Sequence, residues 1–169
     1  MELKDYIRTT LERSKGGLTR ALNTIEQEEI CWRPASGCNS MGLLIFHVAK
    51  SEDNFIHATL QGKPLLWDAD KWYEKLNMPQ DEAGSHYTVE QVNAFPVPDR
   101  DKLLEYYDSV RAGTLAYLDA LDPAEFERKV KTPFAELDVA GIFSIIVSHT
   151  AQHTGEISYL RGMLRGMDK

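Results

Sequence analysis

Three of the five histidines have the residue type and the spacing of a metal site. His149 and His153 lie four residues apart in the segment SHTAQHTGEI, so both imidazoles project from one face of a helix. His47 lies in a second apolar segment, MGLLIFHVA, which is also expected to be helical. If the two helix faces meet inside a bundle, three neutral imidazoles converge. That donor set favours a divalent transition metal such as Zn, Ni, Fe or Cu.

Polar residues continue both faces beside the histidines. Glu156 follows His153 by one turn, and we expect it to orient an imidazole, with proton transfer or a fourth ligand as alternatives. Ser51 and Asn54 continue the face of His47 and are candidates for orienting a substrate or moving protons. Three protein ligands leave at least one coordination position open, so water or a thiol bound there would be activated.

Other metal templates fit this sequence less well. HTAQH has Thr150 where the zinc-protease motif needs a glutamate, and the Glu-x-x-His pairs of a di-iron bundle are absent from the sequence. His57 and His86 are expected to be surface residues. Cys31 and Cys38 lie on neither histidine face, and we expect two reduced, partly buried thiols with no role as ligands.

Four long amphipathic or apolar segments must position these residues. Their periodicity and their capping residues, Ser40 and Asp99 among them, predict four helices and an all-α four-helix bundle. Between the helices we expect a loop, a long insert with a short helix from a capping box at Thr88–Gln91, a short turn opened by Asp122-Pro123, and an extended segment or hairpin. The predicted helices cover about 3–25, 41–60, 100–121 and 140–167; the loop, insert and extended segment cover 26–39, 61–98 and 128–139.

The insert is the longest connection, and a connection of that length is usually functional or has structure of its own. Its aromatic residues either line the mouth of a pocket or pack over the end of the bundle. They are Trp67, Trp72, Tyr73 and Tyr87.

Composition excludes several classes of protein. The 19 Lys and Arg against 26 Asp and Glu give a net charge of −7, which argues against nucleic-acid binding. The apolar run at 41–49 is too short to span a bilayer, no signal peptide is readable, and two cysteines suit a reducing cytoplasm. A length of 169 residues suits one domain over 1–169, and the negative charge is expected on a solvated surface around an uncharged interior.

Several segments together resemble the DinB-like superfamily, also called the DinB/YfiT-like metalloenzymes. The resemblance is carried, in the family's order, by WRPASGCNS, NSMGLLIFHVAKSEDNFI and SHTAQHTGEISYLRGMLRG, and by the insert segments GKPLLWDADKWYEKLNMP and HYTVEQVNAFPVPD. It implies a four-helix bundle of up-down-down-up topology with one long crossover. It also implies that His47, His149 and His153 are the metal ligands. The sequence departs from the family at Glu156, where the family usually has Gln.

The resemblance also implies a class of chemistry. Members with assigned activities are mostly thiol-dependent, namely S-transferases linked to mycothiol or bacillithiol and the maleylpyruvate isomerase. We therefore expect a metal-dependent S-transferase or isomerase that uses Zn or Ni, a low-molecular-weight thiol and a small electrophile. A metal-dependent hydrolase and a non-enzymatic metal-binding or stress-response bundle remain as alternatives. Family bundles commonly pair through helix faces, so a homodimer is expected.

Overall fold

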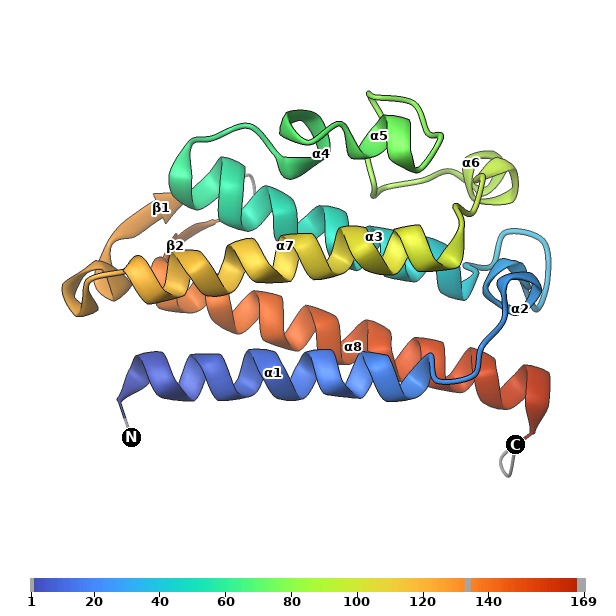
Figure 1. The fold of residues 1–169 in the computed structure, drawn as a ribbon, viewed down its shortest axis with the longest axis horizontal. Helices are drawn as coiled ribbons and strands as arrows, with labels where there is room; N and C mark the ends of the chain where they lie inside the picture. Colours follow the sequence, from blue (N-terminus) through green and yellow to red (C-terminus); the bar gives the residue numbers. More distant parts are fainter. Residues whose placement is uncertain (1, 133–134, 167–169) are drawn as a thin grey trace.

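The computed structural model describes residues 2–132 and 135–166, and these are almost entirely helical (Figure 1). One short antiparallel hairpin of two strands is the sheet present in the described residues. In chain order the elements are α1 (Leu3–Ala21), α2 (Gln27–Cys31), α3 (Met41–Asp53), the π-helix η1 (Asn54–Leu60), α4 (Leu66–Ala69), α5 (Trp72–Lys75), α6 (Val89–Ala94), α7 (Arg100–Ala120), the 3-10 helix η2 (Pro123–Glu127), β1 (Lys129–Lys131), β2 (Glu136–Asp138) and α8 (Val139–Arg165). The predicted all-α class is confirmed.

The four long helices α1, α3, α7 and α8 lie side by side (Figure 1). Helix α1 packs along α8, and α3 packs along both α7 and α8. Helix α3 is central because it is apolar almost all round, and nearly every residue from Met41 to Asp53 is buried. The contact between α3 and α8 is the one that brings His47 toward the histidines of α8.

Side-chain caps start the long helices where the sequence predicts them. The Ser40 hydroxyl accepts a hydrogen bond from the Leu43 N–H at the start of α3, and the Asp99 carboxylate accepts from Lys102 N–H at the start of α7. The expected capping box of Thr88 and Gln91 is present at α6. The short turn after Asp122 is η2, and the expected hairpin is β1–β2.

Two boundaries near the N-terminus differ from the prediction. Helix α1 ends at Ala21 instead of reaching Ile25, and Thr24 has a left-handed backbone conformation (φ 64°) that a helix does not allow. Ile25 is nevertheless fully buried, which explains why the apolar periodicity extends past the helix. The expected loop at 26–39 contains α2, which begins with a capping box between Glu26 and Glu29. At the other end α8 stops at Arg165, and Met167 lies outside the described residues.

The second predicted helix is not α-helical to its end. After Asp53 the backbone continues as a π-helix, whose wider turn rotates the following side chains away from their α-helical positions. The prediction that His57 is exposed was therefore wrong. Only 8% of His57 is exposed, and its Nδ1 lies 2.8 Å from a carboxylate oxygen of Asp53.

The interior is also not uncharged, contrary to expectation. Glu52 and Arg111 form an ion pair of 2.7 Å between α3 and α7, and both side chains are 2% exposed. Asp53 is fully buried, and its carboxylate accepts hydrogen bonds from the Tyr106 hydroxyl and from backbone N–H groups at the start of α4. These acidic groups persist in the core because each is paired or hydrogen-bonded.

The insert packs over one side of the bundle (Figure 1). Trp67 and Trp72 are buried in the main apolar cluster, so they do not line an open mouth. The indole N–H of Trp67 donates to the Gln80 carbonyl and ties one part of the insert to another. Tyr73 is half-buried and packs against the same cluster. Among the described residues, no helix has the length and apolarity needed to cross a membrane.

Candidate metal centre

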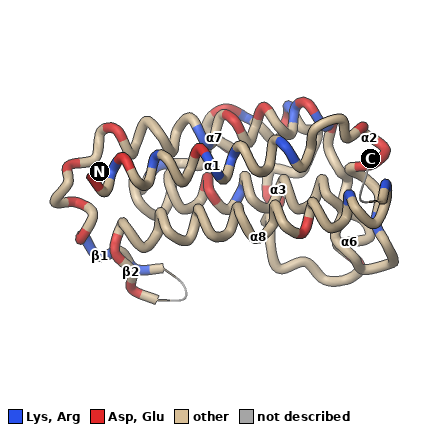
Figure 2. The backbone as a smooth tube through the Cα atoms, turned by 90° about the horizontal axis from the view of Figure 1, so that it is seen from below, with Lys and Arg blue, Asp and Glu red and all other residues tan. Residues whose placement is uncertain are grey.

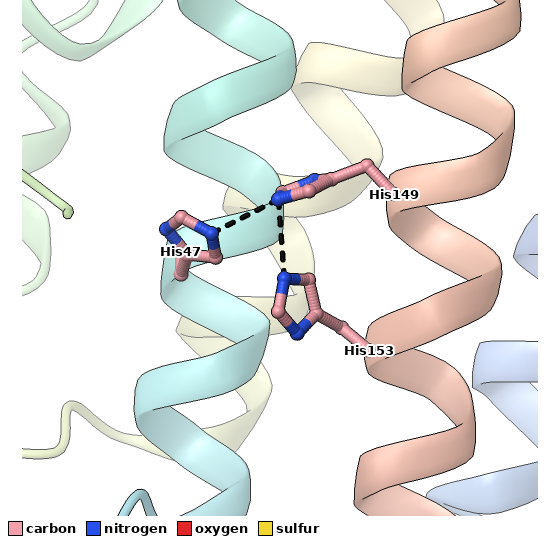
Figure 3. A group of neighbouring side chains, drawn as sticks. All are labelled: His47, His149 and His153. Carbon is pink, nitrogen blue, oxygen red and sulfur yellow. Dashed lines mark hydrogen bonds between the residues drawn. The ribbon is translucent and has the colours of Figure 1, made fainter.

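The side chains of His47, His149 and His153 point toward one another between α3 and α8 (Figure 3). The Nε2 atom of His149 lies 2.9 Å from Nε2 of His47 and 3.1 Å from Nε2 of His153. The candidate ligand atoms of the three residues all lie within 4.8 Å of one another. The two predicted helix faces therefore meet as expected. We call these three residues the histidine cluster.

The outer nitrogens of two of these rings have partners that fix their tautomers. His47 Nδ1 donates a hydrogen bond to the Gly84 carbonyl (2.7 Å), because a carbonyl oxygen can only accept. His153 Nδ1 lies 2.7 Å from a Glu156 carboxylate oxygen and donates to it. In the neutral rings both Nε2 atoms then carry a lone pair, and both face His149.

That arrangement fits a metal ion. One Nε2–H on His149 cannot satisfy two acceptor nitrogens with good geometry, so the cluster has more lone pairs than protons to share. Zinc–imidazole bonds are about 2.0–2.1 Å long, which places nitrogens of one tetrahedral site roughly 3.3 Å apart. The separations of 2.9 and 3.1 Å are close to that value. Carboxylate and carbonyl partners on the outer nitrogens are the usual support of metal-binding imidazoles.

Burial favours the neutral, metal-binding form of His47 and His149. Desolvation, together with the neighbouring rings of His47 and His153, lowers the pKa of His149 to about 4. Desolvation also lowers the pKa of His47, although its hydrogen bond to Gly84 acts in the opposite direction.

Two cavities reach the histidine cluster from different sides. The first, which we call the hairpin cavity, has a volume of about 340 Å³ and is bordered by His47 and His149. The second, the insert cavity, has a volume of about 210 Å³ and is bordered by His47 and His153. The hairpin cavity is lined by His47, Ser51, Asn54, Phe55, Ser85, His86, Thr132, Leu137, Ile145 and His149. The insert cavity is lined by Asn39, Leu43, Leu44, His47, Ser85, His86, Tyr87, Val92 and His153.

The other residues considered for the site lie at different distances from the histidine cluster. Ser51 and Asn54 line the hairpin cavity beside His47 and His149, and Asn54 is the first residue of the π-helix. Glu156 contacts His153 and also borders a larger groove of about 660 Å³, which lies between α8 and the segment that leads into α3. Cys31 and Cys38 are free thiols, as expected, and neither borders the histidine cluster.

The sequence reasoning missed the loop at 84–86. Ser85 and His86 line both cavities, and the Gly84 carbonyl orients His47. Gly84 has φ 77°, and a Cβ atom there would lie 2.5 Å from Cγ of Lys50, so only glycine fits between the loop and α3. No local signal marks this loop, because its place depends on a contact with a helix more than thirty residues earlier.

Comparison with known proteins agrees with the fold. The model of the DinB superfamily matches residues 10–157, and the chain belongs to this superfamily. The crystal structure of a conserved protein from Enterococcus faecalis is similar over 99% of both chains, with a TM-score of 0.86 and 22% sequence identity. That likeness shows the fold alone. No curated protein matches the sequence.

Proposed function

We propose that this protein is a divalent-metal-dependent enzyme in which His47, His149 and His153 hold the metal. Its reaction would be the transfer of a low-molecular-weight thiol to a small electrophile, or a thiol-assisted isomerisation. The observation that carries the proposal is the convergence of three Nε2 atoms, two of them with lone pairs fixed by Gly84 and Glu156. Imidazole ligands suit Zn and Ni as well as Fe and Cu, and we propose Zn or Ni as the bound ion.

A divalent ion bound there would act as a Lewis acid that lowers the pKa of a thiol and so favours the reactive thiolate. The Gly84 carbonyl and the Glu156 carboxylate keep the rings of His47 and His153 oriented by accepting hydrogen bonds from their Nδ1–H groups. Ser51 and Asn54 border the adjoining hairpin cavity, where they would hydrogen-bond the electrophile and orient it toward the sulfur.

In the transfer reaction the thiol loses its proton to solvent, and its sulfur forms a bond to the electrophilic carbon. The leaving group departs with the electron pair of the bond that breaks, so the step needs no oxidant or reductant. In an isomerisation the thiolate would add to a double bond, the resulting single bond would rotate, and elimination would restore the double bond and release the thiolate unchanged.

Turnover tests this function directly. A variant with Cys31→Ser and Cys38→Ser removes the chain's own thiols, which would otherwise consume the electrophile. With 2-mercaptoethanol and an aryl halide, the zinc-loaded variant should accelerate thioether formation above the uncatalysed rate. Adding His149→Ala should abolish that acceleration. Equal rates of thioether formation for the cysteine-free variant and for the same variant with His149→Ala would refute the proposal.

The alternatives predict different outcomes in the same assay. A metal-dependent hydrolase would use water in place of the thiol, so it would cleave esters or amides without added thiol. A non-enzymatic metal-binding or stress-response bundle would bind the metal and catalyse neither reaction. The two cavities beside the histidine cluster support an enzyme, since a purely structural metal site needs no access for a substrate.

Three further features belong to the proposal. We propose the up-down-down-up bundle with the insert as its long crossover, which the side-by-side arrangement of the four long helices supports (Figure 1). We also propose a homodimer that forms through helix faces, and a reducing cytoplasm as the place of action. The exposed Tyr159 and Met163 on α8 support the homodimer. The two free cysteines support a reducing cytoplasm.

A further inference from the structure

The walls of the two cavities beside the histidine cluster contain no formally charged side chain among the described residues. The hairpin cavity combines the apolar Phe55, Leu137 and Ile145 with hydroxyl, amide and imidazole groups. The insert cavity has the same character, with leucine, valine and tyrosine side chains beside Asn39 and Ser85. An anionic group entering either cavity would therefore meet no Lys or Arg in these walls.

The nearby cations are held away from the cavities. Lys50 is the only cation of α3, and its Nζ lies 4.0 Å from the centroid of the buried Trp67 ring. On α8 the first Lys or Arg is Arg161, two turns beyond His153, and Figure 2 shows no Lys or Arg in the preceding stretch of the helix, where Glu156 is the one formally charged residue. Neither helix that holds the histidine cluster thus supplies a cation to a bound substrate.

The hairpin β1–β2 also keeps its charged side chains away from the hairpin cavity. Alternate residues of a strand point to opposite sides, and in β1 the lysines Lys129 and Lys131 occupy the exposed positions. Lys129 is paired with Asp138 on that outer side. Val130 and Leu137, which pair across the hairpin, face the bundle interior. The hairpin therefore presents apolar groups to the cavity and its lysines to solvent.

With a divalent metal ion bound, the net positive charge of the site would be balanced by one bound anion. A divalent ion with three neutral imidazoles carries two positive charges, and the Glu156 carboxylate beside His153 offsets one of them. A single thiolate would offset the other. A carboxylate or phosphate on the second substrate would then be buried without a counter-charge, which is strongly unfavourable.

We infer that the hairpin cavity takes an uncharged electrophile, one without carboxylate or phosphate groups. This inference rests on the proposed function, because the thiol is taken as the one anionic ligand. Ser51 and Asn54 supply hydrogen-bonding groups for a carbonyl or amide, and Phe55, Leu137 and Ile145 supply apolar contact. Within the proposed chemistry, the inference favours neutral electrophiles and disfavours isomerisation of a dicarboxylate.

A matched pair of probes tests the inference by binding alone. Phenylacetamide and phenylacetate have the same shape and differ in charge. Their affinities are measured by calorimetry on the zinc-loaded Cys31→Ser, Cys38→Ser protein with saturating 2-mercaptoethanol. We expect phenylacetamide to bind at least about tenfold more tightly than phenylacetate, because the carboxylate loses its hydration without gaining a partner. Equal affinity, tighter binding of phenylacetate, or no binding of either probe would overturn the inference.

Two variants at Asn54 show whether the probes bind in this cavity. Asn54 is exposed and borders the cavity, so a longer side chain there is tolerated by the fold. Asn54→Lys should shift the affinity ratio at least about tenfold toward phenylacetate, since it supplies the missing cation. Asn54→Gln, the neutral control, should keep the original ratio. A ratio that Asn54→Lys leaves unchanged would refute the assignment to this cavity.

The binding test of the two probes and the thiol-transfer assay can fail independently of each other. If no thiol transfer is observed but the preference for the neutral probe holds, the enzymatic proposal fails and the charge selectivity of the cavity stands. If transfer is observed equally well with carboxylate-bearing electrophiles, the enzymatic proposal stands and this inference fails.

Discussion

The carboxylate of Glu156 lies 2.7 Å from Nδ1 of His153, one turn along the same face of α8. This contact directs the Nε2 lone pair of His153 toward His149 and places a negative charge beside the histidine cluster. On the opposite side, the Gly84 carbonyl does the same for His47 without a formal charge. The two supports differ in charge, so their effects on a bound metal are separable.

Replacing Glu156 should therefore weaken metal binding without unfolding the protein. In Glu156→Gln the amide oxygen can still accept the Nδ1 proton, but the negative charge is lost. We expect zinc affinity to fall by about tenfold, the lower end of the range for such supporting contacts. Competition with a chromogenic chelator measures the affinity. Glu105→Gln, at an exposed position of α7, should leave it unchanged. An unchanged affinity in Glu156→Gln would show that Glu156 does not support the site.

Removing one partner of the buried ion pair should destabilise the bundle strongly. Arg111 lies 2.7 Å from Glu52 and also donates to the Leu11 carbonyl, so it links α7 to α3 and to α1. Arg111→Met leaves the Glu52 carboxylate buried and unpaired, and we expect a loss of about 3–5 kcal/mol in the free energy of unfolding. Urea denaturation measures this loss.

The double variant Glu52→Leu, Arg111→Met provides the control for that experiment. Removing both charges removes the unpaired carboxylate, so most of the lost stability should return. If the double variant were as unstable as Arg111→Met, the loss would come from packing and from the Leu11 contact, and the ion-pair explanation would be wrong.

Lys50 should make stability depend on pH in the alkaline range. Desolvation lowers the pKa of Lys50 from 10.5 to about 8, against the attraction of nearby carboxylates such as Asp53. Between these two pH values the unfolded chain binds more protons than the folded chain, so the free energy of unfolding rises with pH. A shift of this size corresponds to a rise of about 3 kcal/mol at most.

The difference between two pH profiles isolates this contribution. The free energy of unfolding of Lys50→Met should lack the rise between pH 8 and 10.5 that the unmodified protein shows, since methionine does not titrate. Lys63→Met, at an exposed position, should keep it. Parallel profiles for Lys50→Met and the unmodified protein would contradict the lowered pKa. The methylene groups that pack beside Gly84 are retained in the variant, which limits other effects.

The histidine cluster was predictable because it depends on regular helix geometry. The i, i+4 spacing of His149 and His153, and the apolar character of the helix that carries His47, determine which faces meet. Cap residues such as Ser40 and Asp99 were predictable for a similar reason, since their hydrogen bonds are local.

The remainder depends on contacts that no local pattern shows. The π-helix after Asp53 moved His57 from a predicted surface position into the interior, where its Nδ1 lies 2.8 Å from a carboxylate oxygen of Asp53. The burial of Glu52 depends on Arg111, which lies 59 residues away. Ser85 and His86 border the cavities only because Gly84 packs against Lys50. Each of these features is tertiary, so periodicity and propensity do not reveal it.

Metal content is the most direct test of the account. The chain should be expressed without an affinity tag, because histidine tags bind the same metals, and its metal should be measured by mass spectrometry. We predict about one Zn or Ni per chain after purification or after addition of the metal, and none in His149→Ala. A folded chain that contains no metal and does not take up added Zn or Ni would contradict the metal site formed by the three histidines.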